Sequence, residues 1–250
     1  MLHIKSNAIL RIASVILFFL IWQFSSLFFD VDLLPSPHSV FSKIIEESVN
    51  RELFFHTAIT LKRVIISFFI AMLLGTFIGI YMGRNEKVNV FLDDWLVLGL
   101  NVPALVIIIL CYVWFGLNEL AAILAVSLNK IPMVAVIMRE GSRSIEKDYL
   151  EVAKFYNIKN KKLFFKVIFP QLYPYLLSSA RSGLSLIWKI VLVVELLGRS
   201  NGVGFKLYGF FQFFDIAGIL AYTLTFVFLI LIVEFVIVRP FERRISVWRY

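Results

Sequence analysis

Three long stretches without a charged residue limit most strongly what this chain can fold into. They cover residues 12–29, 64–83 and 95–118. Each is long enough for a helix to cross a hydrocarbon core of about 30 Å. With 60% hydrophobic and 17% charged residues, the chain also carries more apolar surface than a water-soluble fold of this length can bury. The sequence therefore predicts an all-α, polytopic membrane protein.

Three further apolar segments complete the predicted set of spans. Residues 119–138, 172–198 and 216–238 are apolar over most of their length and contain a few charged residues. Together with the charge-free runs they predict six transmembrane helices. No soluble-domain linker interrupts them, so we expect a single transmembrane domain that covers residues 1–250.

The region around the first span allows two interpretations. Residues 12–29 resemble the apolar part of a cleaved signal peptide, but the run is unusually long and no small-x-small cleavage site follows it. We therefore favour a first transmembrane helix. In residues 38–55, apolar and charged side chains recur at helical spacing. This pattern predicts an amphipathic helix that lies on the bilayer surface.

Proline and glycine predict local features of two spans. Pro103 removes a backbone donor inside the third span and predicts a kink there. In the second span, Gly75, Gly79 and Gly83 recur every four residues. Such spacing lets another helix approach closely. A lipid-facing helix with incidental glycines is the alternative.

The distribution of basic residues predicts the orientation. If the N-terminus is cytoplasmic, the segments on its side hold sixteen Lys and Arg and the opposite segments hold six, with Lys62 and Arg63 counted among the six. Cytoplasmic loops are enriched in these residues, so we expect both termini in the cytoplasm. The same rule explains the net charge of +8 without a nucleic-acid partner.

The orientation makes residues 139–170 a long cytoplasmic loop between the fourth and fifth spans. Within it, residues 148–170 are basic and helix-prone and also contain aromatic side chains. Cytoplasmic loops of polytopic proteins are usually short, so a loop that forms amphipathic helices is expected to be a docking surface for another protein.

Charged residues within the spans are costly, by roughly 2.5–3.5 kcal/mol each on insertion scales. Lys130, Lys189 and Glu195 are the deepest. The last two are six residues apart, about 240° around a helix, so they do not pair within one turn. Either these charges are satisfied across helices or across a dimer, or they line an aqueous path that attracts an anion. We favour the structural role for Glu195, and both roles stay open for Lys189. With Pro103, these three residues form our candidate translocation pathway.

The residues that would indicate catalysis are missing. The sequence contains no GxxxxGK[ST] phosphate loop. His3, His38 and His56 are too scattered to predict a metal site. Cys111 is the single cysteine, so no disulfide can form within the chain. We therefore predict a protein that is not an enzyme and has no cofactor or metal of its own.

The predicted loop contains a recognisable motif. It resembles the loop of permease subunits in ATP-driven bacterial importers, whose pattern is EAA, three residues, Gly, nine residues, Ile-x-Leu-Pro. Here the matching positions are 151–153, Asn157 and 167–170, with the spacing intact. The departures are at Val152, Asn157, Val167 and Phe169. Asparagine is tolerable at the glycine position because it adopts the left-handed conformation more readily than most residues.

The resemblance extends over nearly the whole chain and indicates the nitrate/sulfonate/taurine branch of this type I importer family. The similar segments are LLPSP (33–37), HTAITLKRV (56–64), GIYMGRN (79–85), WFGLNEL (114–120), IPMV (131–134), SNGVGF (200–205) and PFERRISVWR (240–249).

The resemblance implies an assembly and a mechanism. Two permease subunits, expected to be identical, form one pathway in the bacterial inner membrane. A periplasmic binding protein delivers the solute, and two cytoplasmic ATPase subunits bind ATP and Mg²⁺ and receive the loop at 139–170 as a coupling helix. The residues expected to contact the ATPase are Glu151, Ala153, Lys154, Tyr156, Asn157 and Pro170.

The transported solute is expected to be small and anionic, such as nitrate, a sulfonate, taurine or bicarbonate. The branch that the chain resembles handles such anions, but also aromatic acids and thiamine-precursor pyrimidines. Lys130 and Lys189 favour a negative charge. The competing hypothesis is a stand-alone ion-coupled carrier or channel. It predicts inverted internal repeats and buried carboxylates for coupling, and neither is evident in the sequence.

Overall fold

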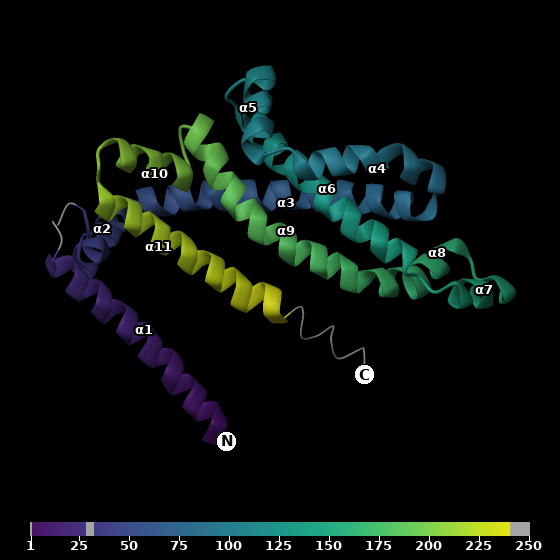
Figure 1. The fold of residues 1–250 in the computed structure, drawn as a ribbon, viewed down its shortest axis with the longest axis horizontal. Helices are drawn as coiled ribbons and strands as arrows, with labels where there is room; N and C mark the ends of the chain where they lie inside the picture. The colour runs from purple at the N-terminus through teal and green to yellow at the C-terminus, as the bar shows by residue number, and fades with distance from the viewer. Residues whose placement is uncertain (1, 29–32, 241–250) are drawn as a thin grey trace.

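The computed structural model describes residues 2–28 and 33–240 and consists there of helices, without a strand (Figure 1). Three helical segments are long and apolar enough to cross a membrane: α3 (Glu52–Arg84), α6 (Glu119–Arg143) and the segment Ile216–Val236, most of which is α11 (Ile216–Val233). A fourth span exists if α4 (Glu86–Asn101) and α5 (Ala104–Phe115) are counted as one bent span. The prediction of an all-α, polytopic membrane protein is confirmed, and the count of six spans stays a prediction.

The centre of the molecule consists of α3, α6 and α9 (Phe169–Gly198), which pack along one another (Figure 1). Their packing explains the glycines of α3. A Cβ atom on Gly79 would lie 2.3 Å from the Ala135 carbonyl oxygen, and one on Gly75 would lie 2.6 Å from the Val134 Cβ. At Gly83 the Ser142 Cβ would be equally close. The predicted close approach is confirmed, and its partner is α6.

The third predicted span, 95–118, is not one continuous helix. The helical segment starts earlier, with α4, and ends at Phe115, and the axes of α4 and α5 differ by 99°. The break falls at Val102 and Pro103, where Val102 is extended. Proline has no N–H to continue the helix and favours an extended residue before it. The predicted kink is therefore a complete break.

The two N-terminal helices differ in how they contact the bundle: α2 (Pro37–Val49) packs against α11 and α3, whereas α1 (Leu2–Phe28) has few contacts. α1 extends away from the other helices (Figure 1), and the indole Nε1 of Trp22 donates a hydrogen bond to the Pro35 carbonyl at 3.1 Å. α2 forms most of the predicted amphipathic helix. It ends before residue 55 because Arg51 adopts a positive φ of 62°, and α3 begins at the next residue.

Short helices cover the two ends of the bundle. At one end, here called the α10 end, α10 (Val203–Gln212) connects α9 to α11 and lies near α2 (Figure 1). At the opposite end, called the α7 end, lie α7 (Lys147–Phe155), α8 (Asn160–Leu163) and the π-helical η1 (Phe164–Ile168), which continues into α9. A second π-helical segment, η2 (Glu234–Val238), follows α11.

Candidate functional site: a buried charge network and an exposed loop

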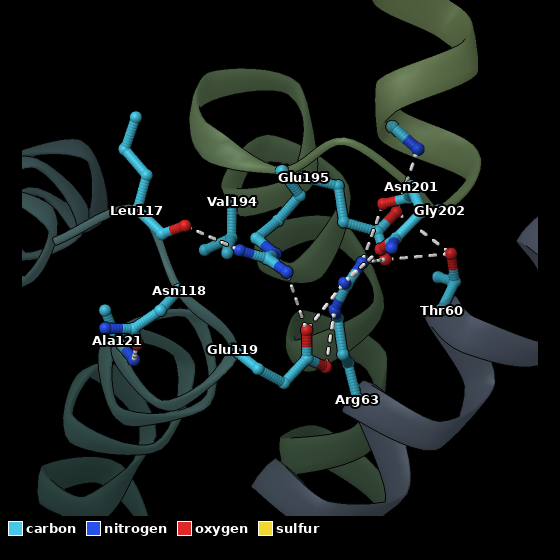
Figure 2. Close-up of polar contacts among 12 residues, drawn as sticks. Thr60, Arg63, Leu117, Asn118, Glu119, Ala121, Val194, Glu195, Asn201 and Gly202 are labelled. Atoms are coloured by element: carbon cyan, nitrogen blue, oxygen red, sulfur yellow. Dashed lines mark hydrogen bonds and ion pairs between the residues drawn. The ribbon is translucent and has the colours of Figure 1, made fainter.

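A carboxylate buried near the α10 end is surrounded by hydrogen-bond donors (Figure 2). The Glu195 side chain, on α9, is fully buried. Its Oε1 accepts from Arg63 Nη1 at 2.8 Å, and its Oε2 accepts from the backbone N–H of Gly204 at 2.9 Å. The Thr60 hydroxyl lies 2.9 Å from both carboxylate oxygens. Burial of this charge is therefore compensated by an opposite charge and by direct hydrogen bonds.

Arg63 is the centre of this charge network and is only 1% exposed. Its Nε and Nη2 donate to the two oxygens of Glu119 at 3.0 and 2.8 Å, a bidentate ion pair. Its Nη1 and Nη2 also donate to the backbone carbonyl and side-chain Oδ1 of Asn201 at 2.8 and 2.5 Å. One guanidinium thus connects α3, α6, α9 and the loop between α9 and α10 (Figure 2).

The loop between α9 and α10 is held tightly over Glu195. Gly202 has a φ of 109°, and a Cβ atom there would lie 2.3 Å from the Glu195 Cδ, so the position excludes a side chain. The Gly202 N–H donates to His56 Nδ1 at 2.9 Å. The next amide, on Val203, donates to the Thr60 hydroxyl at 2.8 Å. These bonds fix the first turn of α10 against α3.

Two neighbouring groups extend these contacts. Arg199 Nη2 lies 3.2 Å from Glu119 Oε2, and its Nη1 donates to the Leu117 carbonyl at 2.8 Å. On the other side of α10, Lys206 Nζ lies 3.1 Å from Glu47 and 3.3 Å from Glu52. These ion pairs join α10 to both α2 and α3.

The four residues predicted to form a pathway lie in different surroundings. Glu195 is paired with Arg63, as described. Lys130 is 2% exposed and lies against α9, where a Cβ on Gly183 would be 3.6 Å from the Lys130 Cε. Lys189 and Pro103 are exposed in the single chain. Their assignment to a pathway stays a prediction.

The partners of Glu195 were missed by the sequence analysis. We placed Arg63 just before the second span, on the side opposite the N-terminus, whereas α3 begins eleven residues earlier and buries Arg63 within the bundle. The earlier start of the helix was not predicted because the segment before residue 64 contains several charged residues. Helical spacing through residues 56–64 was the available signal, but Glu119 and Glu195 are 56 and 132 residues away in the sequence.

The predicted docking loop forms the α7 end. Asn157 has a φ of 48°, the left-handed conformation that we expected at the position of the family's glycine. Ala153 is 2% exposed and is covered by the chain itself. The remaining residues of the predicted contact set are exposed: Glu151, Lys154, Tyr156, Asn157 and Pro170. α7 is joined to α9 by the Glu146 N–H, which donates to Gln171 Oε1 at 3.1 Å.

Comparison with known families decides between the two hypotheses left by the sequence. The family described as "Binding-protein-dependent transport system inner membrane component" matches residues 71–247. The chain belongs to this family. It is therefore a permease, the membrane-embedded component of a binding-protein-dependent transport system, and the predicted family is confirmed.

Several curated relatives of this permease are named for their solutes. It is 30% identical over 217 residues, 87% of this chain and 78% of the relative, to the putative aliphatic sulfonates transport permease protein SsuC of Bacillus subtilis (strain 168). It is 27% identical over 220 residues, 86% and 80% of the two chains, to the taurine transport system permease protein TauC of Escherichia coli (strain K12). The bicarbonate transport system permease protein CmpB of Synechococcus elongatus is 28% identical over 217 residues, 82% and 77% of the two chains.

Solved structures with the same fold come from ABC transporters. An inward-facing structure of the MetNI methionine ABC transporter matches with a TM-score of 0.64 at 17% identity, covering 74% of this chain and 92% of that one. An amino acid ABC transporter crystallised with histidines matches with a TM-score of 0.58 at 19% identity, covering 80% and 94%. At this identity the likeness shows the fold of the permease.

Proposed function

We propose that the permease forms, with a second copy of itself, the translocation pathway of an ATP-driven importer for a small anionic solute. The observation that carries this proposal is the chemistry shared by the three relatives' names: aliphatic sulfonates, taurine and bicarbonate. Each of these solutes carries a compact oxyanion group. The similarity to each of these three relatives covers more than four fifths of this permease.

Lys130 supports an anionic solute. The residue is 2% exposed within the bundle, and none of the ion pairs among residues 2–28 and 33–240 contains its ammonium group. Its hydrogen-bond acceptor is the Met133 thioether sulfur at 2.7 Å, which carries no charge. A lysine buried in a membrane protein without a carboxylate indicates an ion or substrate path. An anion that passes along α6 would supply the missing negative charge.

The other candidate pathway residues receive different roles in this proposal. Lys189 is exposed on α9 and is available to attract an anion. Glu195 holds the loop between α9 and α10 through its bonds to Arg63 and Gly204. Pro103 separates α4 from α5, whose axes differ by 99°.

In each of the two copies, the α7 end is proposed as the docking surface for an ATPase subunit. The two ATPase subunits would bind ATP and Mg²⁺. Its exposed set of Glu151, Lys154, Tyr156, Asn157 and Pro170 offers charge, aromatic surface and a fixed turn. With this end in the cytoplasm, both termini are cytoplasmic, and the α10 end faces a periplasmic binding protein. The permease itself then performs no catalysis.

Transport by the complete system tests the solute class. The permease would be reconstituted into proteoliposomes with its ATPase and binding protein, and uptake of radiolabelled taurine, an alkanesulfonate, nitrate and bicarbonate would be compared with uptake of methionine. We expect ATP-dependent uptake of at least one anion or sulfonate and none of methionine. Uptake of methionine alone would contradict the proposal.

A further inference from the structure

A groove of about 600 Å³ lies between α3 and the junction of η1 with α9. This volume falls within the roughly 300–1,000 Å³ typical of ligand sites. Along α3 its wall is formed by Phe69, Leu73 and Phe77, which are 65%, 73% and 72% exposed. Phe164 and Leu176 form the opposite wall. The groove is therefore almost wholly apolar and open to its surroundings.

The length of the groove fits one leaflet of a bilayer. Its residues on α3 recur every four positions, so they form one stripe on the helix. From Phe69 to Arg84 the helix rises about 22 Å at 1.5 Å per residue. Half the thickness of a bilayer with its headgroups is also about 20–22 Å. A molecule that fills the stripe therefore extends from the middle of the membrane to its surface.

The surface end of the groove is positively charged. α3 ends at Arg84, which lines the groove and is exposed. In the described part of the chain, Arg84 takes part in no ion pair. Lys161 and Lys162, both exposed, belong to the short helix that directly precedes Phe164. The complementary ligand has a long apolar part and an anionic group at one end.

We propose that this groove binds an anionic phospholipid, with an acyl chain along α3 and the phosphate at Arg84. The surrounding bilayer supplies this ligand, and basic pockets at the ends of transmembrane helices bind such headgroups. A helix of a second copy would fill the apolar walls but would leave Arg84 without an anion. The small anionic solutes proposed above are too short to cover the stripe from Phe69 to Arg84.

Native mass spectrometry of the full-length chain, stripped of lipid in detergent, tests the proposal. The probes are phosphatidylglycerol and phosphatidylcholine with identical acyl chains. We expect tighter binding of phosphatidylglycerol, and about a fivefold loss with Arg84→Gln, the effect of one cation near an anionic lipid surface. Lys87→Gln is the matched control, because Lys87 is an exposed cation just beyond the end of α3 that does not line the groove.

A second pair of variants tests the apolar wall. Leu73→Trp narrows the groove and is expected to reduce binding of phosphatidylglycerol, whereas Leu74→Trp changes a neighbouring exposed residue outside the groove and should leave binding unchanged. Size-exclusion chromatography checks that each variant is folded.

Three outcomes would overturn the proposal. Equal binding of the two lipids would show that no headgroup is recognised. If Arg84→Gln and Lys87→Gln weaken phosphatidylglycerol binding equally, the preference for this lipid comes from general surface charge. Cross-linking of two copies through Leu73→Cys, in a Cys111→Ala background, would show that a second copy covers the groove.

Discussion

At the scale of single residues, Arg63 is the charge on which the α10 end depends most. It forms ion pairs with both Glu119 and Glu195, and its removal leaves Glu195 fully buried without a cation. Loss of one partner of a buried pair typically costs about 3–5 kcal/mol, because the remaining charge is uncompensated. Substitution of Glu195 is expected to destabilise the protein less, because Arg63 then still has its bidentate pair with Glu119.

This asymmetry gives the first prediction. Arg63→Met is expected to lower the thermal unfolding midpoint in detergent more than Glu195→Gln does. Lys62→Met serves as the control, because Lys62 is exposed on the same helix and should unfold as the wild type does. If Arg63→Met and Lys62→Met unfold at the same temperature, the network does not stabilise this end of the bundle.

Substitution of Lys130 distinguishes a structural role of this side chain from a role in transport. Lys130→Met keeps the size of the side chain and removes a charge that costs roughly 2.5–3.5 kcal/mol to place within a span, so the folded yield should stay the same or rise. Transport should fall at least tenfold if the ammonium attracts the solute. Lys130→Arg, which keeps the charge, should retain part of the activity. Full uptake by Lys130→Met would exclude Lys130 from the pathway.

At the scale of helices, the sequence predicted the apolar interiors well and the ends poorly. Charge-free runs identified the body of α3, and Pro103 identified the break between α4 and α5. The true start of α3 at Glu52 was not predicted, because its first turns carry charged residues. Arg63, in a later turn, is buried because it pairs with Glu119 and Glu195, which only the folded chain brings near. The local sequence pattern indicates helical periodicity, whereas the pairing of charges that are distant in the sequence depends on tertiary packing.

The contact between α3 and α6 predicts that a glycine-to-alanine substitution changes stability in opposite directions at two positions. Alanine in place of a helical glycine normally stabilises a protein by roughly 0.5–1 kcal/mol. Gly209→Ala, in α10, should follow this rule, since a Cβ there meets nothing within 4 Å. Gly79→Ala should instead destabilise by about 1–3 kcal/mol, the usual cost of overpacking, because its Cβ would lie 2.3 Å from the Ala135 carbonyl. Unfolding midpoints that rise for both variants would show that α3 and α6 pack less closely.

At the scale of the whole molecule, two continuous helices connect the ends of the bundle. α6 begins at Glu119 in the charge network and ends at Arg143 beside α7. α9 begins next to η1 and carries Glu195 close to its C-terminus. A helix of 30 residues is about 45 Å long. α6 and α9 therefore form a continuous helical connection between the α7 end and the loop over Glu195, with Pro132 inside α6 and Pro174 inside α9.

This connection leads to a prediction about the proposed ATPase partner. Glu151 is exposed on α7, so Glu151→Lys should reverse a surface charge without unfolding the permease. We expect the variant to lose most of the ATPase that co-purifies with the wild type, and to lose solute-stimulated ATP hydrolysis. Glu86→Lys is the matched control, because it makes the same charge change on an exposed residue at the start of α4. If both variants retain the ATPase, the α7 end is not the coupling surface. If both release it, the contact depends on the overall charge of this side of the permease and not on Glu151.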